Sequence, residues 1–387
     1  AALDAALATQ LERHESLRTV IDMADPQPRQ LILDTSELPL AFEAAAETST
    51  EALRNRLREL ARQRFDLAVG PLLKLHVLKT APDQYVFLLV IHHIISDLWS
   101  LDVFFKDLGQ LYAAQTSDAE PPAALQIQYA DYAGWQRELL SGARLEQQLR
   151  YWENALNGAP AILEIPTDRP RPGEPGYQGH WLAIDLPASL SAGVHKLAQQ
   201  LNCTPFMLTF AAFSALLNRY SGAEDLVVGT PISGRSRTEL EHLIGFFLNT
   251  LPLRVDLSGS LSFNDLVEQV RKTALHAYSN QDLPFEKLVE ELQPERNMSH
   301  TPVFQHMFIW QDNTANQIEL PGLVTEPATL ISHDTAKFDL TLALTSREDG
   351  IEAGIEYNTD LFDRQTIERM LGHFQTLLTQ VIAKPDS

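Results

Sequence analysis

The sequence predicts an α/β protein built from two lobes, and three observations support this. The chain has 387 residues, which is long for one hydrophobic core and suits two cores of roughly 170 to 210 residues each. Segments typical of strands and of helices alternate along both halves. A proline-rich passage from Ile165 to Gly176 lies between the halves, where regular structure is excluded. We therefore expect an N-terminal lobe over residues 1–165, an interlobe linker over 166–178 and a C-terminal lobe with bridging segments over 179–387.

The first half begins abruptly with a helix. The apolar spacing from Ala1 to Leu11 predicts an amphipathic helix already under way, so we expect that a strand before it is missing. Two apolar runs, Leu72 to Leu78 and Tyr85 to Ile91, predict paired strands joined by a turn. Further helices are expected over 49–65, 98–112 and 129–156.

The second half resembles the first in outline. A strand over 179–186 is followed by helices over 189–201 and 205–220, a strand over 226–230, and helices over 262–279 and 364–382. No sequence repeat is strong enough to establish a duplication.

The composition limits the classes of partner. The chain is 44% hydrophobic, with aromatic residues spread throughout, which indicates a packed globular protein. The net charge of −21 argues against nucleic acid or an anionic membrane as a partner. Cys203 is the only cysteine, so a reducing compartment fits. No run of about 18 apolar residues and no signal-peptide pattern is present, so we expect a soluble cytoplasmic protein without a membrane partner.

Two adjacent histidines, His92 and His93, stand directly after an apolar run typical of a strand, and Asp97 follows four residues after the second. A strand that ends in histidines and passes into a helix can hold an imidazole rigidly at a cleft. Histidine also suits proton transfer near neutral pH. A structural histidine pair is the plainer interpretation. A metal site is not expected, because the i, i+4 histidine spacing of a metalloprotease helix is absent.

Further segments match a known family in their order along the chain. They are Arg13 to Thr19 (RHESLRT), Phe65 to Leu73 (FDLAVGPLL), Tyr129 to Gln136 (YADYAGWQ), Gly229 to Arg235 (GTPISGR), Ile244 to Thr250 (IGFFLNT), Gln281 to Leu288 (QDLPFEKL), Thr301 to Gln305 (TPVFQ) and Ala336 to Leu340 (AKFDL). With the HHxxxD motif, they make the chain resemble the condensation domain of nonribosomal peptide synthetases. Two departures are the missing opening strand motif and Leu98, which replaces the glycine usual after the motif aspartate.

The resemblance implies two chloramphenicol-acetyltransferase-like lobes in a V-shaped pseudodimer, with the active site in the tunnel between them. It implies an acyltransferase in which the amine of a carrier-bound aminoacyl group attacks a carrier-bound acyl, peptidyl or polyketide thioester and forms an amide bond. The implied partners are donor and acceptor carrier domains, next to adenylation or polyketide synthase domains. No cofactor is expected to bind directly, because the phosphopantetheine arms arrive on the carrier domains.

The same resemblance assigns roles within the motif. It implies that His93 is the catalytic residue, and both a general base and a positioning group stay open. His92 is expected to be structural. Asp97 is expected to form a buried ion pair with Arg235, or failing that with Arg254.

Other residues are weaker candidates. Leu98, Trp99, Phe247 and Asn249 are candidates for lining the substrate tunnel, and ordinary packing is the alternative, Trp99 being most simply a core residue. Leu98 lies where the resemblance places the donor side, so it bears on donor identity. Arg54, Arg58 and Arg62 recur every four residues in an acidic chain and are candidates for docking a carrier domain. The alternative is a solvated face on which they pair with Glu51 and Glu59.

Three other functions remain open. An epimerisation domain shares the fold and the double histidine, but it would carry its own asparagine-rich motif in place of Asn249 to Arg254. A free-standing acyltransferase that uses coenzyme A thioesters would need no carrier-docking surface. A recruitment module without catalytic activity usually loses the histidine motif, which is intact here.

Overall fold

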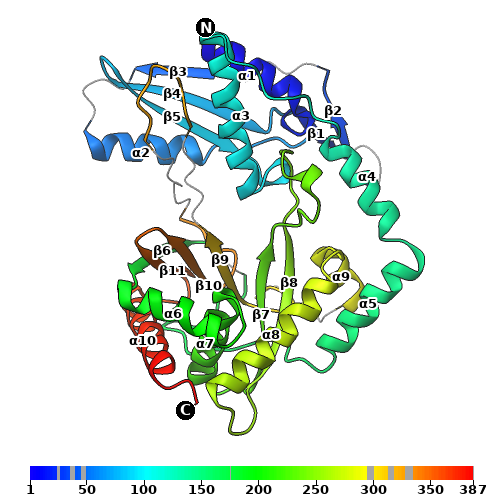
Figure 1. Ribbon diagram of the computed structural model, residues 1–387, viewed down its shortest axis with the longest axis vertical. Coiled ribbons are helices and arrows are strands. Elements are labelled where there is room, and N and C mark those ends of the chain that lie inside the picture. The colour runs from blue at the N-terminus through cyan, green and yellow to red at the C-terminus, as the bar shows by residue number, and fades with distance from the viewer. Residues whose placement is uncertain are drawn as a thin grey trace. The chain divides into compact units, whose positions relative to one another are not determined.

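The computed structural model describes residues 1–23, 27–34, 40–44, 49–174, 176–293, 300–312, 318–326 and 334–386. These residues form two compact units. The first unit takes its described residues from 1–139, 233–248 and 318–326, and the second from 140–232, 249–312 and 334–386. Each unit combines a sheet with helices, as the α/β fold class predicts (Figure 1).

The first unit is built on the sheet β3-β4-β5, in which β4 runs parallel to β3 and antiparallel to β5. Its strands are β1 (Thr19–Asp22), β2 (Arg29–Ile32), β3 (Leu40–Ala44), β4 (Leu73–Ala81) and β5 (Gln84–Ile91). Its helices are α1 (Ala2–Arg13), α2 (Thr50–Ala61), α3 (Leu98–Thr116) and α4 (Tyr129–Leu139), with short 3-10 helices η1 (Glu15–Arg18), η2 (His93–Ile95) and η3 (Thr238–Leu240).

Strand β5 is apolar along its length because both of its faces are covered. Phe87, Leu89 and Ile91 pack into the cluster that contains α1 and α3 side chains. Leu88 and Val90 point the other way and pack with Leu60 of α2. Side chains alternate between faces along a strand, so a continuous apolar run predicts burial on both sides. Figure 1 shows α2 on one side of this sheet and α1 and α3 on the other.

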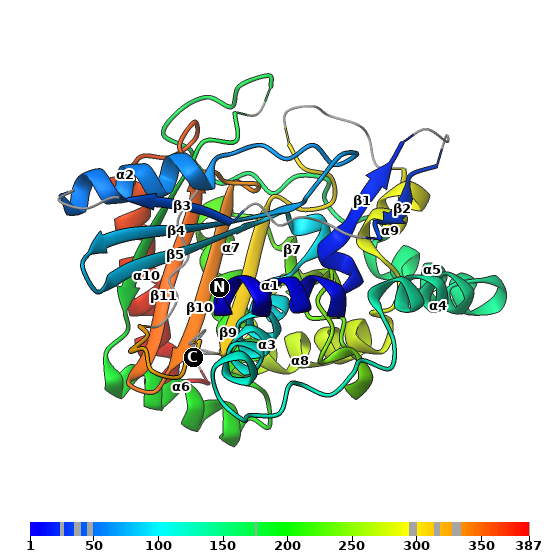
Figure 2. The same ribbon diagram turned by 90° about the horizontal axis from the view of Figure 1, so that it is seen from above.

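The second unit contains a sheet in the order β6-β11-β10-β9-β7-β8, and Figure 2 shows β11, β10 and β9 side by side. The pairs β10-β9 and β9-β7 are parallel and the other pairs antiparallel. The strands are β6 (Gly179–Asp185), β7 (Asp225–Ile232), β8 (Asn249–Asp256), β9 (His306–Asp312), β10 (Leu340–Arg347) and β11 (Gly350–Asn358). The helices are α5 (Gly142–Leu156), α6 (Ala188–Gln200), α7 (Pro205–Ser221), α8 (Phe263–Ser279), α9 (Phe285–Leu292) and α10 (Arg364–Ala383).

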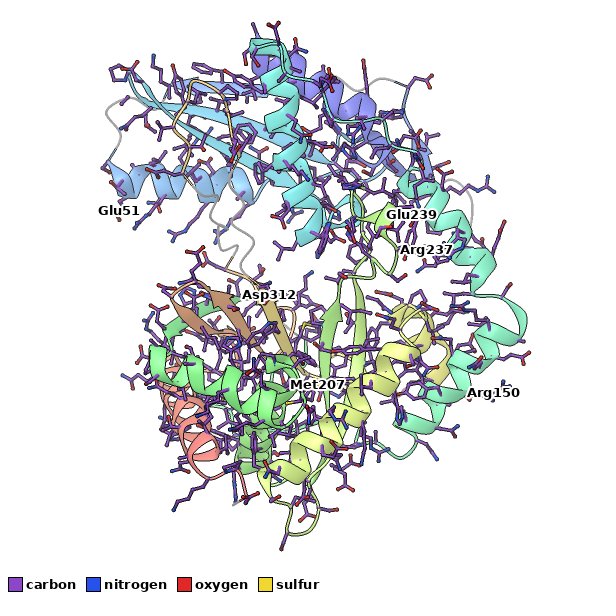
Figure 3. All side chains as sticks on the ribbon, in the orientation of Figure 1. Glu51, Arg150, Met207, Arg237, Glu239 and Asp312 are labelled. Carbon is purple, nitrogen blue, oxygen red and sulfur yellow. The ribbon has the colours of Figure 1, made fainter. Side chains whose placement is uncertain are left out.

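The core of the second unit forms where α7 and α10 pack against the sheet. Phe210 and Phe213 of α7 contact Phe308 of β9, and Phe374 of α10 is fully buried in the same cluster. Met207, labelled in Figure 3, joins this core from the first turns of α7. Proline at the first position of α7 and the Thr204 cap fix where this helix begins.

In the described residues no single helix is long and apolar enough to cross a membrane, although α6 and α7, bent by 106° between them, pass that test as a pair. The same residues contain no group of three or more His, Cys, Asp or Glu side chains placed to hold a metal ion.

The structure corrects the predicted domain boundaries. The first segment of the first unit ends at Leu139, not at residue 165, because α5 belongs to the second unit, and the first unit also takes in 233–248 and 318–326. Trp152 of α5 is buried in that core and its indole N–H donates to the carbonyl oxygen of Asn280 at 2.9 Å. The single helix predicted over 129–156 is two helices. The first ends at Leu139 and the second begins at Gly142, whose φ of +54° lies in the left-handed region.

The proline-rich passage does not link the two units. It lies within the second unit, where Arg169 pairs with Asp363 and Arg171 pairs with Asp339. The chain instead passes between units near residues 139, 232 and 248, at positions without a proline cluster.

Candidate active site

The double-histidine motif lies between the end of β5 and the beginning of α3, and it includes the short helix η2. His92 caps η2, and its Nδ1 accepts the N–H of Ile94 at 3.1 Å. Asp97 caps α3, and its Oδ1 accepts the N–H of Ser100 at 2.9 Å. Both side chains satisfy helix N–H groups that have no partner within the helix. The motif therefore owes its backbone shape to its own polar side chains, and His92 has the structural position that was expected.

His93 is the exposed histidine of the pair, and its ring orientation is fixed. Its Nδ1 lies 2.6 Å from the carbonyl oxygen of Ser96. A carbonyl oxygen only accepts hydrogen bonds, so Nδ1 carries a proton and the lone pair of the neutral ring is on Nε2. The ring of Phe246 stands edge-on to the imidazole, with centroids 5.0 Å apart at 82°. The imidazole thus presents Nε2 as an acceptor for a proton or an N–H group.

Asp97 and Arg235 form the expected ion pair. Arg235 Nη2 lies 3.0 Å from Asp97 Oδ1, and the two side chains are 1% and 4% exposed. The other carboxylate oxygen of Asp97 accepts the N–H of Phe247 at 3.1 Å. With these partners Asp97 does not orient His93 as the aspartate of a serine-protease triad orients its histidine. Arg254, the alternative partner, pairs with Asp225 in the second unit.

Arg235 joins the motif to the segment 233–248. Its Nη1 donates to the carbonyl oxygens of Leu240 and Leu243, and its guanidinium lies 3.9 Å from the centre of the Phe247 ring. Burial lowers the pKa of Arg235, and the neighbouring Asp97 opposes that shift.

Two glycines allow the close approaches around this ion pair. Gly234 has φ +66°, and a Cβ there would lie 1.9 Å from the carbonyl oxygen of Phe247. A Cβ on Gly245 would lie 2.2 Å from the ring of Tyr129. Any side chain at either position would push the segment 245–247 away from its partners.

Two of the tunnel candidates are held in structural roles. Phe247 is buried and packs with Tyr132, Leu240 and Leu243, so ordinary core is the correct interpretation of its side chain. The side-chain amide of Asn249 donates to the carbonyl oxygens of Gln281 and Leu283 and accepts the N–H groups of Thr250 and Phe285. Both of its donor and both of its acceptor positions are thus used, and none remains for a substrate.

The other two tunnel candidates are accessible. Trp99 is 42% exposed, so its interpretation as a core residue is wrong, and its indole N–H donates to the carbonyl oxygen of Glu241 at 2.9 Å. Leu98, the first residue of α3, is half-buried and belongs to none of the apolar clusters formed by the described residues.

Ser100, Tyr129 and Phe246 also belong to this site, although sequence reasoning gave them no role. Ser100 stands three residues after the capping aspartate, a spacing typical of side chains that meet at the start of a helix. Tyr129 was visible only as part of a motif, and Phe246 only as the neighbour of Phe247. Their spacing from His93 along the chain carries no signal, because the contacts are made between distant segments.

The basic stripe on α2 faces outward. Arg54, Arg58 and Arg62 are exposed, while Arg56 bonds to Glu43 and Glu59. Glu59 thus contacts Arg56, which lies beside the stripe of Arg54, Arg58 and Arg62. Within the described residues, Arg54 and Arg58 have no carboxylate within ion-pair distance. Figure 3 labels Glu51, which lies in the first turn of the same helix.

The family model for the Condensation domain matches residues 1–387. The chain belongs to the condensation-domain family. This condensation domain is 44% identical over 381 residues to malpinin synthetase of Mortierella alpina, a match that covers 97% of this chain and 5% of that synthetase. It is 42% identical over 386 residues to the phosphinothricin tripeptide synthetase PhsC of Streptomyces viridochromogenes, covering 98% of this chain and 36% of the relative. The chain thus spans only a part of the length of these relatives.

The fold of the condensation domain is also similar to solved structures. The X-domain from teicoplanin biosynthesis superposes with a TM-score of 0.92 at 33% identity, covering 100% of this chain and 88% of that one. The family resemblance and the α/β fold class inferred from the sequence are therefore confirmed.

Proposed function

We propose that this condensation domain forms an amide bond between two carrier-bound substrates, with His93 handling the proton. The observation that carries the proposal is the state of the imidazole. Nδ1 donates to the Ser96 carbonyl oxygen, which leaves Nε2 as the acceptor on an exposed ring. A thioester is already activated, so the reaction needs two oriented reactants and a group that accepts one proton.

In the proposed reaction the amine nitrogen of the acceptor forms a bond to the thioester carbonyl carbon of the donor. Nε2 of His93 takes the proton that the amine loses, and the Nδ1–H bond to Ser96 stabilises the resulting imidazolium. The carbon–sulfur bond then breaks, and the departing thiolate of the donor phosphopantetheine takes up that proton. A positioning role would use the same Nε2 to accept the amine N–H without removing it. Phosphopantetheine reaches the site as part of the substrates.

The test uses carrier domains loaded with donor and acceptor, and intact-protein mass spectrometry of the acceptor carrier. We expect His93→Ala to lower the rate of transfer by about 10²- to 10⁴-fold, the usual contribution of a general acid or base. His276→Ala, on the exposed side of α8, is the matched control and should keep the wild-type rate. Transfer by His93→Ala at the wild-type rate would show that His93 is not the catalytic group.

A role in binding alone is the second candidate. An X-domain in complex with OxyB matches this fold with a TM-score of 0.91 at 32% identity. The same assay distinguishes the candidates, because a binding module would transfer none of the loaded donors. Equal turnover of coenzyme A thioesters and carrier-bound thioesters would instead indicate a free-standing acyltransferase.

Leu98 provides a test of donor choice. The Leu98 side chain is half-buried at the start of α3 and packs into none of the described apolar clusters. A glycine at this position would leave the volume of that side chain empty. We expect Leu98→Gly to change the ratio of short acyl to peptidyl donor use by about 1–3 kcal/mol, the effect of a few methylene groups in an apolar pocket. Unchanged donor ratios with a lower melting temperature would mean that Leu98 only packs.

We propose further that the exposed arginines of α2 dock an acidic carrier domain. Arg54 and Arg58 carry charge that no described carboxylate neutralises, in a chain of net charge −21. The apolar face of α2 packs on β5, so the arginine face is held rigidly outward. Electrostatic attraction of this kind acts on association and weakens with salt.

The docking proposal is tested by reversing charge. Arg54→Glu with Arg58→Glu should raise KM about tenfold for a carrier-bound acceptor and leave KM unchanged for the same aminoacyl group on free pantetheine. Arg150→Glu is the matched control, because Arg150 is an exposed arginine on α5 (Figure 3). Equal effects on both acceptors would contradict docking at this helix.

A further inference from the structure

The main chain of Gly245 to Phe247 is held by side chains from two helices of the first unit. The N–H of Gly245 donates to Ser100 Oγ at 3.1 Å, and the N–H of Phe247 donates to Asp97 Oδ2 at 3.1 Å. From the other helix, the hydroxyl of Tyr129 donates to the carbonyl oxygen of Phe246 at 2.8 Å. Successive peptide groups on both sides of Phe246 are therefore fixed by side chains of α3 and α4. We call Ser100, Asp97 and Tyr129 the Phe246 clamp.

The Ser100 hydroxyl uses its whole hydrogen-bonding capacity in this clamp. Ser100 is fully buried, and its Oγ lies 2.7 Å from Asp97 Oδ1, 2.9 Å from Arg235 Nη2 and 2.9 Å from the carbonyl oxygen of Gly245. The Ser100 oxygen thus accepts from Arg235 Nη2 and from the N–H of Gly245. Its one proton has two neighbouring acceptors, Asp97 Oδ1 and the carbonyl oxygen of Gly245. The Ser100 hydroxyl is therefore held in one orientation by the groups around it.

Tyr129 contacts the same segment, 245–247, from helix α4. Its ring lies directly against Gly245 and stands edge-on to Phe247, with centroids 5.1 Å apart. Burial raises the pKa of Tyr129 above its ordinary value, so the phenol stays protonated at neutral pH. It is therefore a permanent donor to the Phe246 carbonyl oxygen.

The clamped residue contacts the catalytic ring. Phe246 is half-buried, and its ring lies edge-on to His93 at 5.0 Å. We propose that Tyr129 and Ser100 are positioning residues, which fix the peptide of Phe246 and through its ring fix the direction of the His93 Nε2 lone pair. Only the catalytic consequence rests on the function proposed for His93, since the orientation of the ring is a separate, measurable property.

The sharpest test removes one oxygen atom. Tyr129→Phe keeps the ring against Gly245 and deletes the donor to the Phe246 carbonyl oxygen. Tyr151→Phe is the control. Tyr151 is a half-buried tyrosine on α5 of the second unit, where its ring packs against Trp152. The measurements are the ¹H–¹³C signals of the His93 ring in histidine-labelled protein, assigned with His93→Ala, and kcat and KM for transfer between loaded carriers.

We expect Tyr129→Phe to shift the His93 ring signals, because the edge of an aromatic ring changes the field at its neighbour. It should lower kcat about five- to tenfold with KM within twofold, the loss of roughly one hydrogen bond expressed only in the transition state. Tyr151→Phe should leave both readings at wild-type values. Unmoved His93 signals and an unchanged kcat in Tyr129→Phe would overturn the proposal, as would a lower melting temperature as its only effect.

A second variant keeps the proposal testable if Tyr129→Phe does not fold. Phe246→Leu leaves the main-chain hydrogen bonds in place and removes the ring beside His93. It should move the His93 signals and lower kcat to a similar degree, and unchanged signals would contradict the clamp. Shifted signals with a wild-type kcat would uphold the clamp as a device that orients the ring, and would contradict the catalytic role of His93.

Discussion

Two arginine–aspartate pairs, one in each unit, have the same chemistry and different surroundings. Arg235 and Asp97 in the first unit are 3.0 Å apart and 1% and 4% exposed. Arg254 and Asp225, on β8 and β7 of the second unit, are 2.7 Å apart and 28% and 35% exposed. Burial lowers the pKa of Arg235, whereas the hydrogen bonds that Arg254 donates to Asp225 raise the pKa of Arg254. Both aspartates raise the pKa of their arginine, and burial alone turns the net shift of Arg235 downward.

The comparison shows that the exposure of an ion pair, and not the distance between its charges, determines how much the pair contributes to stability. In the buried pair the loss of hydration is the largest influence on the arginine, and the aspartate is needed to offset it. In the half-exposed pair water can solvate either charge, so the shorter contact is expected to contribute less. A buried pair also fixes the groups around it, which is why Asp97 and Arg235 can hold the segment beside His93.

The largest expected effect is the loss of Asp97. Asp97→Ala should lower the free energy of unfolding by about 3–5 kcal/mol, because Arg235 would be left buried and unpaired. Asp225→Ala should cost about 0–1 kcal/mol, since water replaces the carboxylate. Urea unfolding of both variants measures the difference. Similar losses in the two variants would break the comparison.

A double-mutant cycle sharpens the same comparison. The coupling free energy between Asp97→Ala and Arg235→Ala should be about 1–3 kcal/mol, so the double variant loses less than the sum of the single variants. For Asp225→Ala and Arg254→Ala we expect a coupling free energy below about 1 kcal/mol. Strict additivity in the first cycle would remove the proposed role of the buried pair.

The smallest effect concerns pH and a third buried contact. His14 Nε2 lies 2.9 Å from Asp107 Oδ2, between α1 and α3. Burial is the largest influence on His14 and lowers its pKa, although Asp107 opposes the shift. The fold thus favours the neutral ring, and the unfolded chain takes up the proton first as the pH falls. The stability that His14 contributes is present above its unfolded pKa of about 6.5 and is lost below it.

The measurement is the difference in the free energy of unfolding between wild type and His14→Gln at pH 8 and at pH 5.5. The wild-type advantage should shrink at the lower pH. His276→Gln, which changes an exposed histidine of α8, is the control and should show no such change. A wild-type advantage that grows toward pH 5.5 would mean that His14 is protonated in the folded protein.

Sequence reasoning located the elements whose apolar pattern is strong and local. The helices α1, α2, α3, α6, α7, α8 and α10 and the strands β4 to β7 were expected near their observed positions. Strands β8 to β11 were missed. Strand β9 pairs with β10 and β7, which are distant in the chain, whereas β10 and β11 form a local hairpin that sequence reasoning overlooked. The unit boundaries were misplaced for a related reason. Proline density indicates where regular structure stops, and it gives no information on which core a segment such as α5 joins.

At the site, the sequence indicated the residues of the histidine motif, such as His93 and Asp97. The structure added the residues that contact them, such as Ser100 and Phe246. Arg235 was matched to Asp97 through the family resemblance, since more than 130 residues separate them in the chain. Asn249 was misjudged, because a polar amide in an apolar segment looks the same in sequence whether it faces a ligand or bonds to the main chain.

The Phe246 clamp contacts only main-chain atoms of the residue that it fixes. Nothing in its hydrogen bonds depends on a phenyl group at position 246, so other side chains there would be held with the same backbone path. Substitution at position 246 would therefore change the shape beside His93, and with it the orientation of the imidazole, on an unchanged backbone path. For protein engineering, position 246 allows the surroundings of His93 to be varied while these main-chain hydrogen bonds are kept.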